Sequence, residues 1–434
     1  MHRIQHAENG RHDLQDDAQD GRFAEGRQRR EAVARRPAVR SLGARLALAV
    51  LLAVLGALLL APLRAAVSPG SAPTALAFDA AERARIGELG PWPPAVPRDA
   101  SNRVSGHRSA IAFGEVLFHS ARLSSVGGLR CASCHEPWRS FTDARALGLG
   151  AAQGGRNTMS LLNVGLQHEF GWDGANDSLW AQSIRPLLDP REMRMSPAQA
   201  AALLRDDPQL AALYQRAFGS APSGDDDAVL ADIGKALAAY EETLVSERTP
   251  FDAFRDAIAS GDRIAAARYP IDAQRGLRVF AGAGQCVACH GGANFSDGRF
   301  HRSRIASMLP DGEPDSGRRA GAQHLLASRF NLLGRFNDDA RRTTAAATRD
   351  AAADIARSGE FRTPSLRDVA ATGPFMHDGS VANLCDAIAP HASMQASDPV
   401  ELSLAQRRDV VAFLRSLSVE PQPPHVDAAV FRCR

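Results

Sequence analysis

Hydrophobic residues recur at helical spacing along most of the chain after about residue 98. Between residues 225 and 246, the side chains of Val229, Ile233, Leu237, Tyr240 and Leu244 fall on one helical face. No convincing run of alternating apolar and polar residues, the pattern of a half-buried strand, occurs in the sequence. The pattern therefore predicts a mainly α fold.

Capping residues mark where several of these helices begin and end. The dipeptides Ser196–Pro197 and Asp207–Pro208 each place a capping side chain before a proline at the first helical position. Gly219 predicts the end of the second of these helices. Ser403 and Gln406 form a capping box that opens a last helix.

Polar segments separate the helical regions. Residues 64–97 are rich in proline, alanine and glycine, which predicts a linker. Residues 302–358 are rich in arginine, alanine and aspartate and poor in apolar residues, so we expect a long surface excursion there.

A chain of 434 residues exceeds what one core usually spans. We therefore expect two domains, at residues 98–255 and 265–434.

The N-terminal region predicts export. A polar, Arg-rich tail at residues 1–45 precedes an apolar run of 18 residues at 46–63. This run is either a signal anchor in the membrane or the apolar region of a cleaved signal peptide. Both interpretations place the rest of the chain outside the cytoplasm, in the periplasm, either soluble after cleavage or anchored to the inner membrane. The formal net charge of +2 gives no reason to expect a nucleic-acid partner.

Two copies of the pattern Cys-x-x-Cys-His carry the most specific chemistry in the chain. They are Cys131, Cys134 and His135 in the first copy, and Cys286, Cys289 and His290 in the second. Zinc would require further ligand pairs nearby, and a thioredoxin-type pair would require a βαβ setting. Covalent haem explains every residue, because the thiols bind the haem vinyl groups and the histidine ligates the iron. The sequence therefore predicts two c-type haems.

Two further cysteines, Cys385 and Cys433, are left over. In an oxidising compartment they could form a disulfide that tethers the C-terminal tail over the second haem domain. A free Cys385 and a disordered tail remain the alternative.

Long motifs give the chain a resemblance to the bacterial dihaem cytochrome c peroxidase family, which includes MauG-like enzymes. The resemblance covers about residues 107–418 and implies two cytochrome c-like haem domains packed together. It rests on "GEVLFHSARLSSVGGLRCASCHEPWRSFTD", "GRNTMSLLNV", "GWDGANDSLWAQSIRPLLDPREM", "RGLRVFAGAGQCVACHGGANFSDGRFH" and "FRTPSLRDVAATGPFMHDGSVANL", in the family's order and spacing.

The resemblance implies a role for each haem and for its neighbours. His135 would hold the N-terminal, peroxidatic haem and His290 the C-terminal, electron-transfer haem. Glu192 matches the distal acid-base carboxylate, which moves a proton between the two oxygens of a peroxide. Gln182 matches a distal-pocket glutamine. The alternatives are that Glu192 is a surface charge and Gln182 a helix cap.

Further matches concern the region between the haems. Trp172 matches a tryptophan that relays electrons from one haem to the other, and its alternative role is packing. Asn157, Thr372 and Pro374 match a calcium site between the domains, since calcium prefers amide and carbonyl oxygens. The alternative is that these three residues only form turns.

The chain departs from the family pattern in the loop after the first haem motif. Classical members carry a histidine there that caps the peroxidatic iron until the other haem is reduced. Between Glu136 and Gln167 this chain has no histidine, and its one methionine, Met159, lies in the motif of the calcium site. We therefore expect an open sixth position on the first haem, as in MauG-like members.

The distal ligand of the second haem is the other departure. The family places methionine or tyrosine at the position that His391 occupies here. Met394 and Met376 are the alternatives. Methionine would favour a high reduction potential, and histidine a lower one.

The resemblance implies an oxidoreductase that reduces hydrogen peroxide at the first haem with electrons relayed through the second. A small cytochrome c or a cupredoxin would be the electron donor. One alternative is a MauG-like enzyme that uses a high-valent dihaem state to oxidise a partner protein. A second alternative is a non-catalytic dihaem electron carrier, which would need both haems fully ligated.

Overall fold

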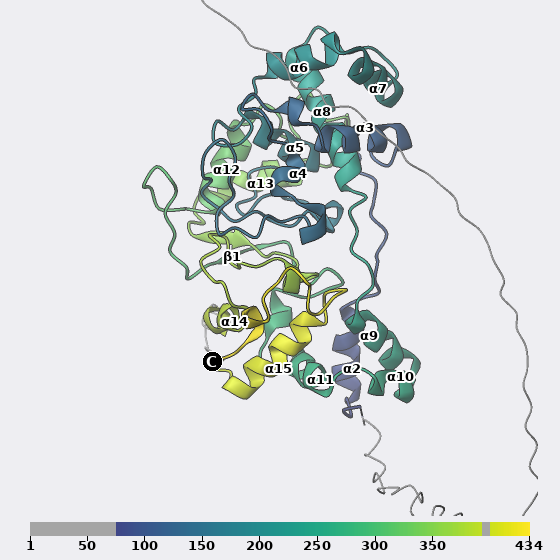
Figure 1. Cartoon of the computed structure of the whole chain (residues 1–434), viewed down its shortest axis with the longest axis vertical. Coiled ribbons are helices and arrows are strands. Elements are labelled where there is room, and N and C mark those ends of the chain that lie inside the picture. Colours follow the sequence, from purple (N-terminus) through teal and green to yellow (C-terminus); the bar gives the residue numbers. More distant parts are fainter. Residues whose placement is uncertain (1–74, 393–399) are drawn as a thin grey trace, which may run out of the picture. The chain divides into compact units, whose positions relative to one another are not determined.

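Helices make up nearly all of the regular structure in residues 75–392 and 400–434, the part of the chain that the computed structural model describes (Figure 1). Strands β1 (Phe300–Arg302) and β2 (Glu360–Arg362) pair antiparallel, with Phe300 opposite Arg362. The mainly α prediction is therefore confirmed. The tail at 1–45 and the apolar run at 46–63 lie outside the described residues, within which no helix is long and apolar enough to cross a membrane.

One hydrophobic core surrounds α8 (Asp226–Glu241). Three helices pack against α8, namely α3 (Arg108–Phe118), α5 (Leu179–Leu188) and α6 (Pro197–Asp206), while α7 (Pro208–Phe218) packs on α3 and α6. Val229, Ile233 and Leu237 are fully buried there, as their spacing predicts. The helix ends at Glu241, before Leu244, whose carbonyl oxygen accepts a hydrogen bond from the backbone of Asn163. The short helix α4 (Cys131–Cys134) also packs against this core.

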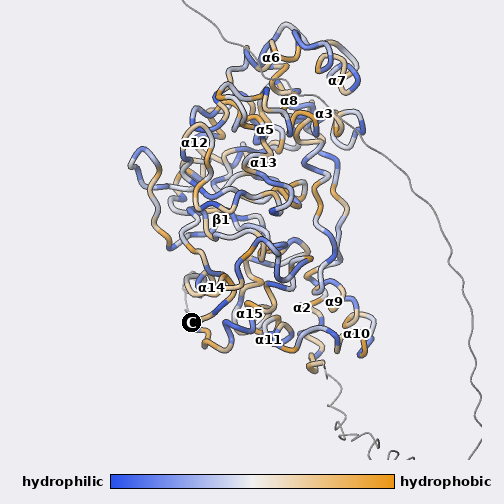
Figure 2. The backbone as a smooth tube through the Cα atoms, viewed as in Figure 1, coloured by the Kyte–Doolittle hydropathy of each residue, from blue (hydrophilic) through white to orange (hydrophobic). Residues whose placement is uncertain are grey.

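A second hydrophobic core forms where α11 (Ile271–Ala281) packs on α15 (Leu404–Arg415). Gly276 allows the close approach, because a Cβ atom there would collide with the backbone carbonyl of Asp409. Hydrophobic and hydrophilic residues alternate along the helices of both groups (Figure 2). The other helices of this group are α2 (Ala80–Glu88), α9 (Pro250–Ser260), α10 (Arg263–Ala267) and α14 (Leu384–Ala392).

Short turns of 3-10 helix connect these elements. Two of them matter for the site, because η2 follows the first Cys-x-x-Cys-His motif and η4 contains part of the second. The turns are η1 (Ala121–Leu123), η2 (Pro137–Arg139), η3 (Val164–Leu166), η4 (Cys286–Ala288), η5 (Val369–Ala371) and η6 (Ala428–Phe431).

The predicted helix caps are confirmed. Ser196 caps α6 and Ser403 caps α15, each in a reciprocal capping box with a glutamine. Asp207 caps α7, and Gly219 ends that helix in the left-handed conformation that glycine adopts without a steric penalty.

The prediction that residues 64–97 form a linker is wrong for Ala80–Glu88, which forms α2. A capping box between Asp79 and Glu82 begins this helix. Ile86 and Leu89 are buried in the second core, and the helix packs against α9 and α11. The flanking sequence is rich in proline, so its composition predicts a linker even though this short segment has the apolar residues of a helix that packs on a core.

The prediction that residues 302–358 form a surface excursion is also wrong in part. This segment contains α12 (Arg318–Ala327) and α13 (Ala346–Asp354), which pack on each other. Phe330, Leu332 and Phe336 are buried in the first core. The segment follows the second haem motif in sequence, yet it completes the core around the first. The boundaries at 98–255 and 265–434 therefore do not separate the two cores. This segment of the second range joins the first core, and Phe251 and Phe254 of the first range are buried in the second core.

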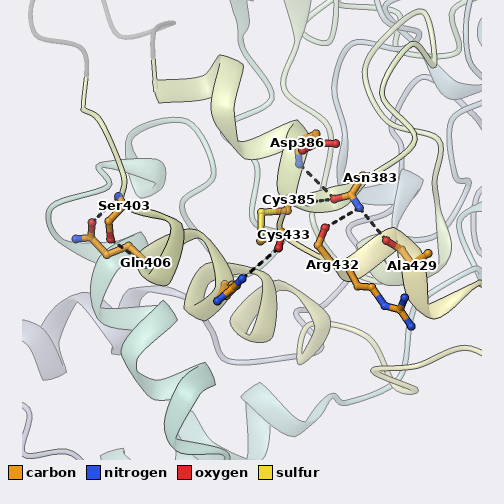
Figure 3. Close-up of a disulfide and its surroundings, with 9 residues drawn as sticks. Asn383, Cys385, Asp386, Ser403, Gln406, Ala429, Arg432 and Cys433 are labelled. Atoms are coloured by element: carbon orange, nitrogen blue, oxygen red, sulfur yellow. Dashed lines mark hydrogen bonds between the residues drawn. A yellow bond between two sulfur atoms is a disulfide. The ribbon is translucent and has the colours of Figure 1, made fainter.

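Cys385 and Cys433 form a disulfide, with their Cα atoms 5.3 Å apart (Figure 3). Both cysteines are buried in the second core. Asn383 reinforces the tether, since its side-chain amide donates to the carbonyl oxygens of Ala429 at 2.8 Å and Arg432 at 3.0 Å. The C-terminal tail is thus fixed to the start of α14.

Replacing both cysteines of this disulfide with serine is expected to lower the free energy of unfolding by about 2–4 kcal/mol, because the bond closes a long loop in the unfolded chain. The two cysteines are separated by 48 positions. Guanidinium unfolding of the oxidised wild type and the double variant measures the difference. A reductant should lower the stability of the wild type and leave that of the variant unchanged. Equal stability of the two oxidised proteins would contradict the prediction.

Candidate functional site

The first Cys-x-x-Cys-His motif forms the short helix α4, with His135 directly after it. The Nδ1 atom of His135 lies 3.0 Å from the carbonyl oxygen of Phe141. A carbonyl oxygen can only accept, so Nδ1 carries the hydrogen and Nε2 carries the lone pair of the neutral ring. Burial lowers the pKa of His135 and so favours that neutral form. A neutral imidazole oriented through one nitrogen is the form that ligates iron through the other.

The second motif repeats this geometry. Its first cysteine begins η4, and the Nδ1 atom of His290 lies 3.1 Å from the carbonyl oxygen of Phe295. His290 is buried. Both histidines are therefore oriented in the same way, by a phenylalanine carbonyl a few residues further along the chain.

The thiols of both motifs are held protonated by burial. Burial raises the pKa of Cys134 to about 11 and that of Cys286 to about 11, and it raises the pKa of Cys131 further. A catalytic dithiol needs the opposite shift, because the thiolate is the nucleophile in disulfide exchange. The redox-pair interpretation of these motifs therefore has no support from the structure.

A zinc site is not formed by either motif. The described residues bring one group of three potential ligands together, Cys289, Asp297 and His301, whose ligand atoms lie within 4.8 Å of one another. This group includes neither His290 nor Cys286. A structural zinc site closes with four ligands, usually cysteine and histidine.

A cavity of about 580 Å³ opens beside the second motif. Cys286, Cys289 and His290 line it together, and apolar side chains such as Leu384 and Val410 form other parts of its wall. A large, mainly apolar space that contains two cysteines and an oriented histidine suits a haem bound through thioethers and one imidazole. The residues present thus fit the group.

Glu192 lies beside the first motif. The loop at residues 149–152 contacts both, because the sulfur of Cys134 lies 3.7 Å from the carbonyl oxygen of Leu149 and the N–H of Ala151 donates to the carbonyl oxygen of Glu192. The charge of Glu192 also contributes to the raised pKa of Cys131 and Cys134. Burial raises the pKa of Glu192 itself, and Arg185 offsets part of that effect. The carboxyl group is therefore partly desolvated, and its role as an acid-base group of the first haem stays a prediction.

The loop after the first motif fixes the backbone of Glu192. The N–H of Ala151 donates to the carbonyl oxygen of Glu192 at 3.0 Å, and that of Ala152 donates to the carbonyl oxygen of Arg191 at 2.8 Å. Gly150 makes this approach possible, because a Cβ atom there would lie 2.6 Å from the Cα atom of Glu192. Gly150 is a site residue that the sequence alone did not reveal.

Gln182 lies on α5, in the helical turn before Pro186. Its side-chain oxygen accepts a hydrogen bond from the amide of Asn176 at 2.8 Å. This bond orients the side chain and leaves its NH2 group as the donor available to another partner. A direct role beside Glu192 stays a prediction.

Trp172 lies at the wall of the cavity beside the second motif. Its indole N–H donates to the carbonyl oxygen of Asn157 at 2.9 Å, and its ring lies 6.4 Å from that of His377, edge to face. An indole at the wall of that cavity is in position to exchange electrons with a haem there. Relay to the first haem stays a prediction.

The three residues of the predicted calcium site, Asn157, Thr372 and Pro374, line the same cavity. The backbone N–H of Asn157 donates to the carbonyl oxygen of His377 at 2.8 Å, and its side-chain amide donates to that of Arg145 at 2.8 Å. The structure therefore brings the three residues to one region, and calcium binding there stays a prediction.

Three residues are candidates for the distal ligand of the second haem, namely Met376, His391 and Met394. Met376 lines the cavity. Position 391 belongs to α14, whose residues Leu384, Ala387 and Ile388 line the cavity. Met394 lies outside the described residues. The choice stays a prediction that favours His391.

Buried charges near the site were not predicted from the sequence. The guanidinium of Arg156 forms ion pairs with two carboxylates, that of Asp173 at 2.5 Å and that of Asp315 at 2.7 Å. Asp173 directly follows Trp172 in the chain. Glu241, on α8, hydrogen-bonds to Ser183, and burial raises the pKa of its carboxyl group to about 8. It lies close enough to Cys131 to raise the pKa of that thiol. A helical glutamate or a loop arginine carries no sequence signal of such burial.

The fold and the two motifs together define a mainly helical protein built to carry two covalently attached haems. The family model for di-haem cytochrome c peroxidase matches residues 108–259. Methylamine utilization protein MauG of Methylorubrum extorquens is 34% identical over 76% of this chain and 83% of its own length. Cytochrome-c peroxidase IdrP1 of Denitromonas iodatirespirans is 31% identical over 80% of this chain and 91% of its own length. The chain belongs to the dihaem cytochrome c peroxidase and MauG family.

Solved structures agree with this fold. A MauG-like protein associated with microbial copper homeostasis is 25% identical, with a TM-score of 0.56 over 79% of this chain and 96% of its own. The diheme peroxidase BthA of Burkholderia thailandensis has a TM-score of 0.59 at 21% identity, over 80% of this chain and 92% of its own. The second likeness supports the fold alone.

Proposed function

We propose that the protein reduces hydrogen peroxide at the haem held by His135, with electrons relayed through the haem held by His290. The observation that carries this proposal is the position of Glu192, a partly desolvated residue whose backbone is held by the same loop that contacts the thiol of Cys134. A dihaem electron carrier would have no need for an acid-base group there.

The haem iron supplies the site where peroxide binds and its O–O bond is broken. Glu192 takes the proton from the oxygen that approaches the iron and returns it to the oxygen that leaves as water. The burial of Glu192 suits this task, because a raised pKa lets one carboxyl group serve first as base and then as acid. Gln182 donates a hydrogen bond that orients the peroxide.

The first haem is open to peroxide in this proposal. Between Glu136 and Gln167 the chain has no histidine and one methionine, Met159. The sulfur of Met159 lies 3.5 Å from the guanidinium of Arg362. Met159 also lines the cavity of the second motif. These contacts support the view that Met159 does not cap the first iron.

A MauG-like activity, in which a partner protein is oxidised, is the second candidate. The 34% identity to a methylamine utilization protein MauG supports it, as does the missing capping histidine. The third candidate, an electron carrier, requires two fully ligated haems. Carbon monoxide binding to the reduced first haem alone would exclude it.

The two enzymatic candidates are separated by mixing the purified diferric protein with hydrogen peroxide, with and without a reduced small cytochrome c. Rapid oxidation of the cytochrome supports peroxide reduction. A long-lived change in the haem spectrum with slow cytochrome turnover supports the MauG-like activity. No reaction with peroxide in either mixture would contradict both.

The proposal also includes a calcium ion near the haems and a location in the periplasm. A calcium ion at Asn157, Thr372 and Pro374 would fix the approach of the two haems, and a chelator should then slow electron transfer between them. Export through residues 46–63 would place the protein in the periplasm, where a small cytochrome c or a cupredoxin donates electrons. Fractionation of cells that express the full chain tests this location.

Replacing Gly150 with alanine is expected to lower peroxide turnover by about 100-fold, because a displacement of roughly 1 Å at a reacting group costs that much. The added Cβ atom would lie 2.6 Å from the Cα atom of Glu192 and 2.7 Å from the carbonyl oxygen of Arg191, so Glu192 must move. Steady-state peroxidase assays measure the effect.

Gly154→Ala is the matched control in the same loop. Its Cβ atom would meet no atom closer than the carbonyl oxygen of Gly148 at 3.3 Å, away from Glu192. Turnover close to wild type is expected for this variant. Equal losses in the two variants would show that the loop tolerates no side chain at all, and wild-type turnover in Gly150→Ala would contradict the role of its close approach.

A further inference from the structure

Arg362, the last residue of β2, is a buried arginine that faces the cavity of the second motif. Its exposed fraction is 3%, and it lines the cavity beside Trp172 and Met159. Its Nε atom donates to the carbonyl oxygen of Gly171 at 3.0 Å, and its Nη2 atom lies 3.5 Å from the sulfur of Met159. The guanidinium is thus held in one orientation.

This guanidinium has no carboxylate partner among the described residues. The other buried arginines of the described residues all have one: Arg318 pairs with Asp354, Arg367 with Asp252, and Arg255 with Asp256. The charges of Glu169 and Asp173 act on Arg362 from a distance, since these carboxylates pair with Arg318 and Arg156. No carboxylate oxygen of residues 75–392 or 400–434 lies within 4.0 Å of the Arg362 guanidinium. Burial lowers its pKa to about 10, so the group still carries its charge at neutral pH. A buried charge without a partner is costly to a fold unless a ligand supplies the counter-charge.

We propose that Arg362 binds a propionate carboxylate of the haem that His290 holds. The inference rests on the second haem of the proposed function. A haem is apolar except for its iron and its two propionate groups, so a propionate is the anion that this cavity would receive. The planar guanidinium matches a carboxylate with two parallel hydrogen bonds.

Arg362 also connects this propionate to Trp172. Its backbone N–H donates to the carbonyl oxygen of Trp172 at 2.8 Å, so one residue holds both the haem edge and the backbone of the indole. Arg362 is therefore a positioning residue for electron transfer. Its charge also stabilises the reduced haem, because the oxidised iron carries one more positive charge.

The test is a spectroelectrochemical titration of the second haem in the wild type and in Arg362→Gln, Arg362→Lys and Arg302→Gln. Total haem is first measured to show that both groups are attached. At a fixed applied potential, the ratio of reduced to oxidised second haem should fall about tenfold in Arg362→Gln. This change corresponds to a reduction potential lower by about 59 mV for a one-electron couple. Arg362→Lys keeps the charge and should stay near the wild type.

Arg302, on the paired strand β1, is the matched control, because it lines the same cavity but is exposed. Water and salt screen its charge, so Arg302→Gln should shift the potential little. In Arg362→Gln the unpaired propionate should also gain a higher pKa, and the potential should fall as the pH rises through the acidic range. The wild type should lack that dependence.

Three results would overturn the inference. The first is an unchanged reduction potential of the second haem in Arg362→Gln with both haems attached. The second is a potential that falls as far in Arg362→Lys as in Arg362→Gln, and the third is a potential that falls as far in Arg302→Gln. If Arg362→Gln does not fold, Arg362→Met, which keeps an apolar stem of similar length, replaces it. The titration uses no peroxide, so it is independent of whether peroxide turnover is found.

Discussion

Replacing Glu192 with glutamine is expected to lower peroxide turnover by about 10²–10⁴-fold, the usual contribution of a positioned acid-base group. Glutamine keeps the size of the side chain but can neither accept nor return the peroxide proton. The haem content and the resting haem spectrum should stay unchanged, because Glu192 is not an iron ligand in this account. Stopped-flow mixing with hydrogen peroxide measures the rate.

The pH dependence gives a second signature of the same residue. The carboxylate is the form that accepts the proton, and burial raises the pKa of Glu192 above that of an ordinary glutamate. Peroxide binding and cleavage should therefore slow as the pH falls through this raised pKa. The acidic limb should disappear in Glu192→Gln.

Asp189→Asn is the matched control for the charge of this loop. Asp189 raises the pKa of Glu192 by repulsion, so its removal should move the acidic limb to lower pH and leave turnover at neutral pH close to wild type. Asparagine can still accept the hydrogen bond that the backbone of Arg191 donates to Asp189 at 2.8 Å. Wild-type turnover in Glu192→Gln would contradict its assignment as the acid-base group.

Replacing Trp172 with phenylalanine is expected to slow electron transfer between the haems by roughly tenfold or more, equivalent to at least about 1.4 kcal/mol in the barrier. Phenylalanine is much harder to oxidise than indole, and it loses the hydrogen bond to Asn157. The first haem should still react with peroxide at the wild-type rate. Rapid-mixing spectroscopy at the wavelengths of the second haem measures the transfer.

Trp138→Phe is the control, because Trp138 also lies near the first motif but is 60% exposed and outside the cavity of the second motif. Its ring contacts Arg139 and His425. Transfer at the wild-type rate is expected in this variant. If Trp172→Phe transfers electrons as fast as the wild type, the relay does not pass through Trp172.

Local chemistry explains which parts could be predicted from the sequence. The caps of α6, α7 and α15 are set by one or two residues whose hydrogen bonds form within a single turn. The haem motifs are similarly local, since the cysteines and the histidine lie on one short turn. The pairing of Cys385 with Cys433 stayed open, because spacing alone does not show whether two cysteines meet in the fold.

Tertiary contacts explain what was missed. The segment that holds Phe330 and Phe336 is polar on average, yet these few aromatic residues reach the first core. Ile86 and Leu89 bury α2 in the second core within a sequence whose composition resembles a linker. The unpaired charge of Arg362 depends on which carboxylates the fold places nearby, and no sequence pattern gives that information.

The central claim is that the first haem is open and that Glu192 is ready to act on peroxide without prior reduction. Rapid-freeze electron paramagnetic resonance of the diferric protein, before and after mixing with one equivalent of hydrogen peroxide and no reductant, tests it most directly. A high-spin ferric signal at rest that disappears on mixing is the predicted result. Low-spin signals alone at rest, with no reaction until one haem is reduced, would contradict the account.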